Sequence, residues 1–196
     1  MHADAVVVHD HHGEHDAIDV FGFWLYIMTD CILFGCLFAT YLVLNTPHGP
    51  ALKDYLDLYD VLVETFFLLV SNFTFCLAML ALNQNHVRRV QFWLFITFLL
   101  GASFVFLEVK EFIHMAGEGF RWDVSGHASS FFTLVGTHGF HVSCGLIWIL
   151  FLIIQLPFFK ITHIMRRRMT YLGLFWNFLD IVWIFVFTIV YLMGAL

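Results

Sequence analysis

The chain has 196 residues, of which 61% are hydrophobic and 19% aromatic, and its formal net charge is −6. This apolar content excludes an ordinary water-soluble domain, whose surface must be largely polar. Much of the acidic charge lies in the first twenty residues and in the first loop. The first twenty residues contain five of the twelve histidines and neither Lys nor Arg. We therefore expect residues 1–20 to form a polar, His-rich, disordered cytoplasmic tail. Whether its histidines bind a metal stays open.

Five segments are long and apolar enough to cross the roughly 30 Å of a bilayer core as helices. They are residues 21–44, 61–82, 91–114, 129–156 and 171–193. The breaks between them are short and rich in Pro, Gly, Asn or basic residues. No internal repeat or further domain boundary is visible. The sequence therefore predicts an all-α, polytopic membrane bundle of five transmembrane helices over residues 21–196.

Six of the nine Lys and Arg residues lie in the second and fourth loops between these segments. Basic loops stay in the cytoplasm, so we expect a cytoplasmic N-terminus and a periplasmic C-terminus. Aromatic residues at the predicted span ends are typical of an interfacial belt. They are Tyr41, Tyr59, Trp93, Tyr171 and Tyr191.

Asp30 is the only charged residue inside the first span, about ten residues from its start. An ionisable group in hydrocarbon is costly and rarely persists without a partner or a role. The carboxyl group is either a structural hydrogen-bonding group or a functional one that relays protons or contacts lipid. The residue pattern leaves both interpretations open.

Two histidines, His138 and His141, share one face of the fourth span, and Glu108, Glu111 and His114 end the third. A haem held by two histidines needs one from each of two facing helices. The other candidate, His114, lies nearer the membrane surface than His138 and His141. We therefore favour structural histidines bonded to Glu108 or Glu111 and expect no metal site.

The remaining intramembrane polar residues fit a structural network rather than a reaction centre. Glu64 lies near the outer start of the second span, and Asn177 and Asp180 share a face of the fifth. No catalytic residue is predicted, because no nucleophile constellation, phosphate loop or thiolate cluster occurs. Rows of small residues predict close helix packing. They are Cys31, Gly35 and Ala39 in the first span and Gly139 and Ser143 in the fourth.

Five stretches resemble, in the same order, the helices of subunit III of the haem–copper oxidases. The clearest are FGFWLYIMTDCILFGCLFATYLVL, THGFHVSCGLIWILFLI and FWNFLDIVWIFVFTIVYLMG, and ETFFLLVSNFTFCLAM and LEVKEFIHM fit the two helices between the first pair. The resemblance covers nearly the whole chain from residue 20. Members of the quinol-oxidase branch of that family have five helices rather than seven, so the resemblance implies this branch.

The resemblance implies a subunit without a redox centre of its own. It would support subunit I, which carries haem b, haem o and copper, in a bacterial inner-membrane complex that also contains subunits II and IV. Such a complex oxidises ubiquinol, reduces dioxygen to water and moves protons, and this subunit would hold phospholipid. Asp30 matches a buried acid of the family, which is usually Glu, and the subunit as a whole is thought to help proton uptake. Asn177 stands where the family commonly has His, which weakens a proton-transfer role at that position.

Two other classes of function stay open on the residues alone. A free-standing b-type cytochrome would use His114, His138 and His141 as ligands. A small proton-coupled transporter would work through Asp30, but the internal repeat typical of such proteins is not visible.

Overall fold

The computed structural model describes residues 3–44, 58–159 and 161–192, which are almost entirely helical. All five helices contain stretches long and apolar enough to span a membrane, which confirms the five predicted spans and the all-α class. A π-helical turn, η2 (Phe187–Leu192), continues the last helix. The helices are α1 (Ala3–Leu44), α2 (Leu58–Asn83), α3 (Val87–Gly117), α4 (Gly126–Phe159) and α5 (His163–Val186).

The chain forms two compact units, residues 1–36 and residues 37–196. Within its described residues, the first unit is a single helix, the larger part of α1. Because α1 begins at Ala3, the expectation of a disordered lead-in before residue 20 is wrong. No proline interrupts the sequence between Ala3 and Leu44, so the apolar span continues N-terminally as helix without a break.

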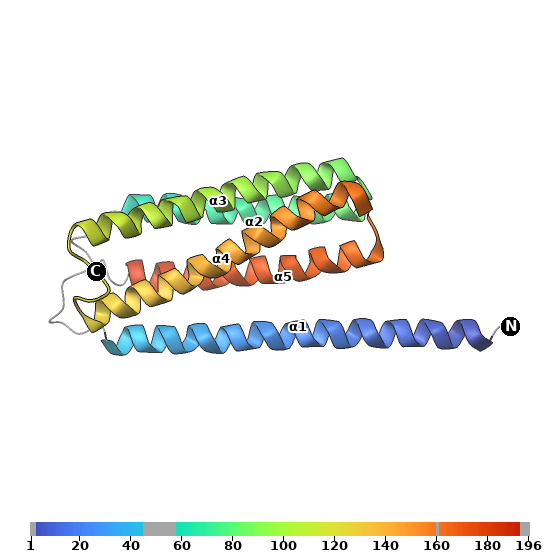
Figure 1. The fold of residues 1–196 in the computed structure, drawn as a ribbon, viewed down its shortest axis with the longest axis horizontal. Helices are drawn as coiled ribbons and strands as arrows, with labels where there is room; N and C mark the ends of the chain where they lie inside the picture. Colours follow the sequence, from blue (N-terminus) through green and yellow to red (C-terminus); the bar gives the residue numbers. More distant parts are fainter. Residues whose placement is uncertain (1–2, 45–57, 160, 193–196) are drawn as a thin grey trace. The chain divides into compact units, whose positions relative to one another are not determined.

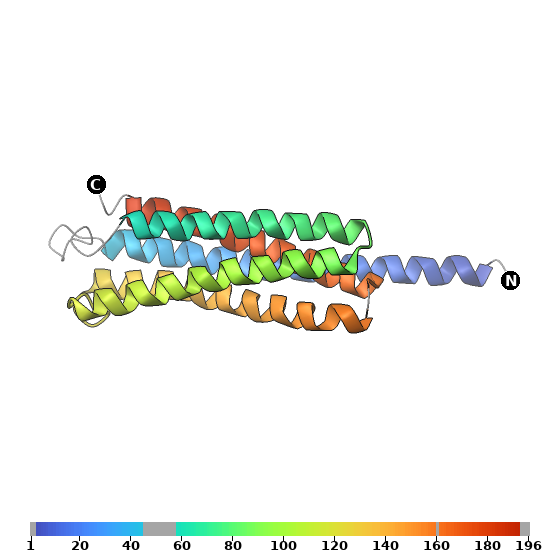
Figure 2. The same cartoon turned by 90° about the horizontal axis from the view of Figure 1, so that it is seen from above.

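In the second unit α2, α3, α4 and α5 lie side by side (Figures 1 and 2). The turn between α2 and α3 is tight because Asn85 adopts a left-handed conformation with φ 60°. The backbone N–H of Asn85 donates to Leu82 (3.1 Å) and that of His86 to Ala81 (3.2 Å), the two bonds of a Schellman motif. The start of α5 is capped by Thr162, whose hydroxyl oxygen accepts a hydrogen bond from the Met165 N–H at 3.4 Å.

Three glycines of this unit allow large aromatic rings to pack against helix backbone. A Cβ atom at Gly101 of α3 would lie 3.1 Å from the Trp176 ring of α5, and one at Gly145 of α4 would lie 2.9 Å from the same ring. A Cβ atom at Gly173 would lie 2.9 Å from Phe75 of α2. Such close approach is how membrane helices gain van der Waals contact in the absence of a hydrophobic driving force.

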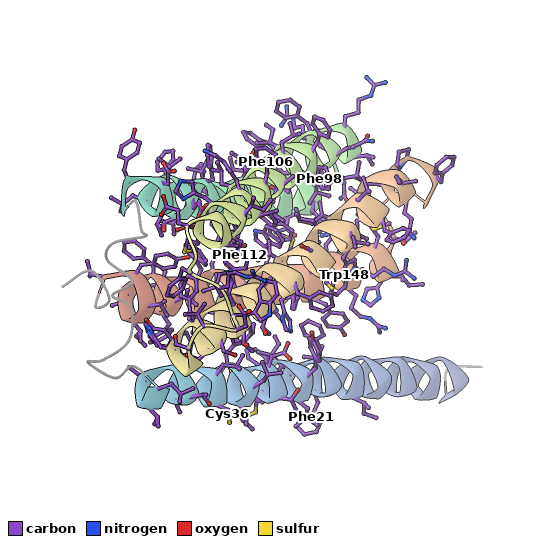
Figure 3. The ribbon with its side chains drawn as sticks, turned by 60° about the vertical axis from the view of Figure 1, so that its left-hand side comes forward. Phe21, Cys36, Phe98, Phe106, Phe112 and Trp148 are labelled. Carbon is purple, nitrogen blue, oxygen red and sulfur yellow. The ribbon has the colours of Figure 1, made fainter. Side chains whose placement is uncertain are left out.

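Two of the five residues expected in an aromatic belt are instead buried in the bundle. The ring centroids of Tyr41 and His127 are 5.1 Å apart, and those of Tyr191 and Phe131 are 5.9 Å apart. Tyr59, by contrast, is 76% exposed. The belt interpretation is therefore wrong for Tyr41 and Tyr191, because these rings fill gaps between helices. Neighbouring aromatic contacts extend this core. Phe112, which is labelled in Figure 3, packs against Phe132 with ring centroids 5.1 Å apart.

Candidate functional site

Three carboxyl groups from two helices meet inside the second unit. Glu64 lies near the start of α2, and Glu108 and Glu111 lie near the end of the antiparallel helix α3. The three are within electrostatic range of one another. Glu64 is only 1% exposed and Glu108 only 2%. The structure thus brings Glu64 close to Glu108 and Glu111, two acids of α3 that are far from it in sequence.

The carboxyl group of Glu108 lies directly against α4 at Gly139. A Cβ atom at Gly139 would come within 2.8 Å of Oε2 and 3.0 Å of Oε1 of Glu108. Among the described residues neither oxygen of Glu108 has a hydrogen-bond partner, so the histidines of α4 are not bonded to Glu108; a bond to Glu111, the other predicted partner, stays a prediction. Gly139 therefore provides the space in which the acid fits, and any side chain there would displace it.

His138 is fully buried one residue before this glycine and packs between aromatic rings. Its imidazole stacks on Trp183 of α5, with centroids 5.1 Å apart and an interplanar angle of 30°. The Phe104 ring of α3 meets His138 edge-on at 6.0 Å and Trp183 at 4.7 Å. The Trp183 Nε1–H donates to Thr65 Oγ1 of α2 at 3.0 Å. Side chains from four helices are joined at this point.

The π-helical turn η2 brings a further polar group to the same region. Tyr191 is buried there, packs against Trp183 at 6.1 Å and lies within electrostatic range of Glu64, Glu108 and Glu111. A π-turn shifts the register of the residues that follow it, and such turns are frequent at functional sites. We define the acidic cluster as Glu64, Glu108, Glu111 and Tyr191, of which all but the half-buried Glu111 are buried.

The two polar residues of α5 have different environments. Asp180 is buried, and the side chain of Asn72 of α2 lies beside it. Asn177 is exposed, and its side-chain amide donates to the Gly173 carbonyl of its own helix at 2.8 Å. The structure therefore places Asp180 between helices and leaves Asn177 on the outer surface of the unit.

Other predicted site residues form local contacts. His141 Nδ1 lies 2.7 Å from the Thr137 carbonyl, and Ser143 donates to the Gly139 carbonyl at 2.8 Å, both within α4. His114 is exposed, 3.8 Å from a carboxylate oxygen of Glu118. The first two contacts lie within α4, and the third joins His114 to the residue that follows the end of α3.

The residues predicted to matter in α1 fall on both sides of the boundary between the two units. Asp30, Cys31 and Gly35 belong to the first unit, and Ala39 belongs to the second, where it is exposed. Within its own helix, Asp30 is one turn before Phe34 and sits near the middle of the membrane-spanning stretch Val20–Leu44.

Several residues of this region were not singled out from the sequence. Thr65 and Ser71 of α2 accept from the indole N–H groups of Trp183 and Trp176, at 3.0 and 3.3 Å. Tyr191 is a further example. A signal was present in the sequence, since Trp and Tyr inside a span need a partner for their polar atom.

Among the residues that the structure describes, no group of three or more His, Cys, Asp or Glu side chains is arranged to hold a metal ion. The His138 ring lies against the aromatic rings of Trp183 and Phe104. The arrangement can join four helices through rings, hydroxyl groups and carboxyl groups. It is a polar packing centre in the interior of a membrane bundle.

Comparison of the sequence with known protein families identifies the family of this chain. The family model described as cytochrome c oxidase subunit III matches residues 3–195. The chain belongs to this family, as the resemblance of the quoted sequence motifs led us to expect.

Within the family, relatives from the quinol oxidases match along the whole length. Cytochrome bo(3) ubiquinol oxidase subunit 3 of Pseudomonas aeruginosa is 54% identical, over 99% of this chain and 95% of the relative. The subunit of the same name from Pseudomonas putida is 51% identical, over 93% of this chain and 90% of the relative. Quinol oxidase subunit 3 of Bacillus subtilis is 40% identical, over 98% and 96%.

Proposed function

We propose that this chain is subunit 3 of a cytochrome bo(3)-type ubiquinol oxidase and acts there without a redox centre of its own. The observation that carries the proposal is the 54% identity to that subunit of Pseudomonas aeruginosa over 99% of the chain. Ubiquinol oxidation and dioxygen reduction would occur in subunit I, at haem b, haem o and copper. This chain would bind subunit I directly and share the complex with subunits II and IV.

The contacts inside the second unit fit a subunit that supports its partners rather than one that contains a reaction centre. Its polar side chains are used to join helices, as when Trp183 stacks on His138 and donates to Thr65. Each such bond between membrane helices stabilises by about 0.6 kcal/mol, up to about 1.7. A rigid bundle of this kind suits a subunit that packs beside subunit I and holds phospholipid against it.

We place the chain in the bacterial inner membrane, with its N-terminus in the cytoplasm and its C-terminus in the periplasm. The support is the distribution of charge, because six of nine Lys and Arg residues lie in the α2–α3 and α4–α5 connections or beside them. A C-terminal alkaline phosphatase fusion should be active and a C-terminal green fluorescent protein fusion dark. The opposite pattern would reverse this orientation.

Asp30 is proposed to influence proton uptake by the complex. Its support is its place as the one charged residue in the described span Val20–Leu44. Asp30→Asn should lower ubiquinol-dependent oxygen uptake or move the alkaline limit of the pH–rate profile to lower pH. An unchanged turnover and an unchanged profile would leave Asp30 a purely structural acid.

The direct test of the assignment is gentle purification of the tagged chain from its native membrane. The expected product contains a large haem-bearing polytopic partner and shows ubiquinol-dependent oxygen uptake. A reduced-minus-oxidised haem spectrum that follows the isolated chain, free of partners, would contradict the proposal. It would favour a free-standing b-type cytochrome instead.

A further inference from the structure

A row of carboxyl groups leads from the start of α2 into the interior of the second unit. Asp60 lies in the first turn of α2 and is exposed, whereas Glu64, one helical turn further on, is only 1% exposed. Residues four apart lie on the same face of a helix, and Asp60 is within electrostatic range of Glu64. This pair therefore links the aqueous surface to a carboxyl group that is shielded from it.

The neighbouring helix α3, which lies beside α2 (Figure 2), continues the row to greater depth. Glu111 and Glu108 are both within electrostatic range of Glu64, and Glu108 is only 2% exposed. Glu108 lies nine residues before the end of α3 at Gly117. At 1.5 Å per residue, its backbone is about 13 Å from that end. We define the carboxyl row as Asp60, Glu64, Glu111 and Glu108.

The charged groups that act on the interior of this row are other acids. They are Glu111, Glu108 and Asp60 for Glu64, and Glu111 for Glu108. His138 of α4 lies beside Gly139 in the sequence, but no described residue bonds to the carboxyl oxygens of Glu108. An ionised carboxyl group buried without a cationic partner costs several kcal/mol, so such a group takes up a proton instead.

Tyr191 of η2 gives an independent indication that this interior holds a polar ligand. Its side chain is fully buried, its hydroxyl group bonds to no described residue, and it is within electrostatic range of Glu64, Glu108 and Glu111. The hydroxyl group of Tyr41, also in range of Tyr191, is equally buried and without a described partner. Buried polar groups of this kind are commonly satisfied by ordered water. The described acids are not arranged for a metal ion, so water and protons are the ligands that suit them.

We propose that the carboxyl row exchanges protons between the aqueous phase and the interior of the second unit, where Glu64 and Glu108 store them. A proton that Asp60 takes from water passes to Glu64 while Glu64 gives its own to Glu111, so the number of protons inside stays constant. Each transfer occurs where two acids bond to each other or to a common water molecule. This activity goes beyond the supporting role proposed above. With the orientation proposed there, the row opens to the periplasm.

The test is infrared spectroscopy of the intact complex that is purified with the tagged chain. A protonated carboxyl group has a C=O stretching band that an ionised one lacks, and the band shifts when deuterium replaces the proton. The bands lost in Glu64→Gln and Glu108→Gln identify the two interior acids. In the unmodified complex both bands should be present and should shift after transfer to D2O. Asp60→Asn should keep both bands and slow their shift about a hundredfold, as expected when a positioned proton-transfer group is lost.

Glu118→Gln is the matched control, because Glu118 is an exposed acid just after the end of α3 and lies outside the row. It should change neither the bands nor the rate of their shift. Recovery of the whole complex shows that each variant is folded, and where a Gln variant is not recovered, Glu64→Asp or Glu108→Asp identifies the same band by displacing it. Absence of both bands from the unmodified complex would overturn proton storage. Bands that never shift in D2O, that shift as fast in Asp60→Asn as in the unmodified complex, or that slow equally in Glu118→Gln would overturn the exchange through Asp60.

Discussion

The two ends of the second unit place their charged side chains in opposite environments. At one end Glu64 and Glu108 are buried between helices. At the other end the arginines lie at the surface, where Arg166 and Arg168 donate to the side chains of Asn83, Asn85 and Gln155. The difference follows from side-chain length, because a long arginine can extend to the membrane surface from a helix end.

This contrast shows where each end obtains its stability. The acidic end depends on close packing around side chains that are too short to extend to the membrane surface, such as the Glu108 carboxyl group against Gly139. The basic end depends on exposed hydrogen bonds and on the backbone geometry of one turn. Substitutions at the acidic end should therefore cost more free energy of unfolding than substitutions at the basic end.

The largest effect is expected for Gly139→Ala. The new Cβ atom would lie 2.8 Å from the buried Glu108 carboxylate oxygen, and overpacking of this kind costs about 1–3 kcal/mol. The free energy of unfolding of the purified complex or chain in mixed detergent micelles measures the loss.

The matched control for Gly139→Ala is the same change in a Glu108→Ala background, where the colliding carboxyl group is gone. There the cost should fall to less than half. An equal cost in both backgrounds would show that the contact with Glu108 is not the cause.

A smaller loss is expected for Trp183→Phe, because the ring stack on His138 is largely kept while the hydrogen bond to Thr65 is lost. Bonds between membrane helices are worth about 0.6 kcal/mol on average and up to about 1.7. In a double-mutant cycle with Thr65→Val, the two substitutions should be strongly non-additive. Strict additivity would mean that the indole does not depend on this hydroxyl group.

The smallest losses are expected at the basic end, in the α2–α3 turn. Asn85 has φ 60° and accepts from Arg166 at 2.8 Å. Asn85→Gly keeps the backbone geometry and loses only the hydrogen bond, so its cost should stay below about 1 kcal/mol. Asn85→Ala should cost more, because Ala is strained in the left-handed region by about 1–2 kcal/mol. A glycine variant less stable than the alanine variant would contradict this account of the turn.

Much of the fold follows from the sequence because each apolar run is long, uninterrupted and separated by clear breaks. The same reasoning failed at residues 1–20, where polarity was interpreted as disorder although the segment contains no helix-breaking proline. It also failed at Tyr41 and Tyr191, since position near a span end does not show which side of a helix faces the core.

For the candidate site, the sequence identified the ionisable residues but not their neighbours. That Glu64 lies near Glu108 depends on the antiparallel pairing of α2 and α3. Which of the adjacent residues Gly139 and His138 faces Glu108 depends on how α4 is rotated about its own axis. Hydrogen-bonding hydroxyl groups such as Thr65 are common in membrane helices, so their pairing with one indole among six tryptophans is a property of tertiary packing.

The most direct test of the central claim, a supporting subunit without a redox centre, is His138→Phe in the whole complex. Phenylalanine preserves the aromatic ring that stacks on Trp183 and removes both imidazole nitrogens, the only atoms through which this residue could ligate a haem. The haem content per complex and the reduced-minus-oxidised spectrum should be the same as in the unmodified complex. Loss of one haem signal in proportion to the substituted subunit would contradict the account and make His138 a ligand.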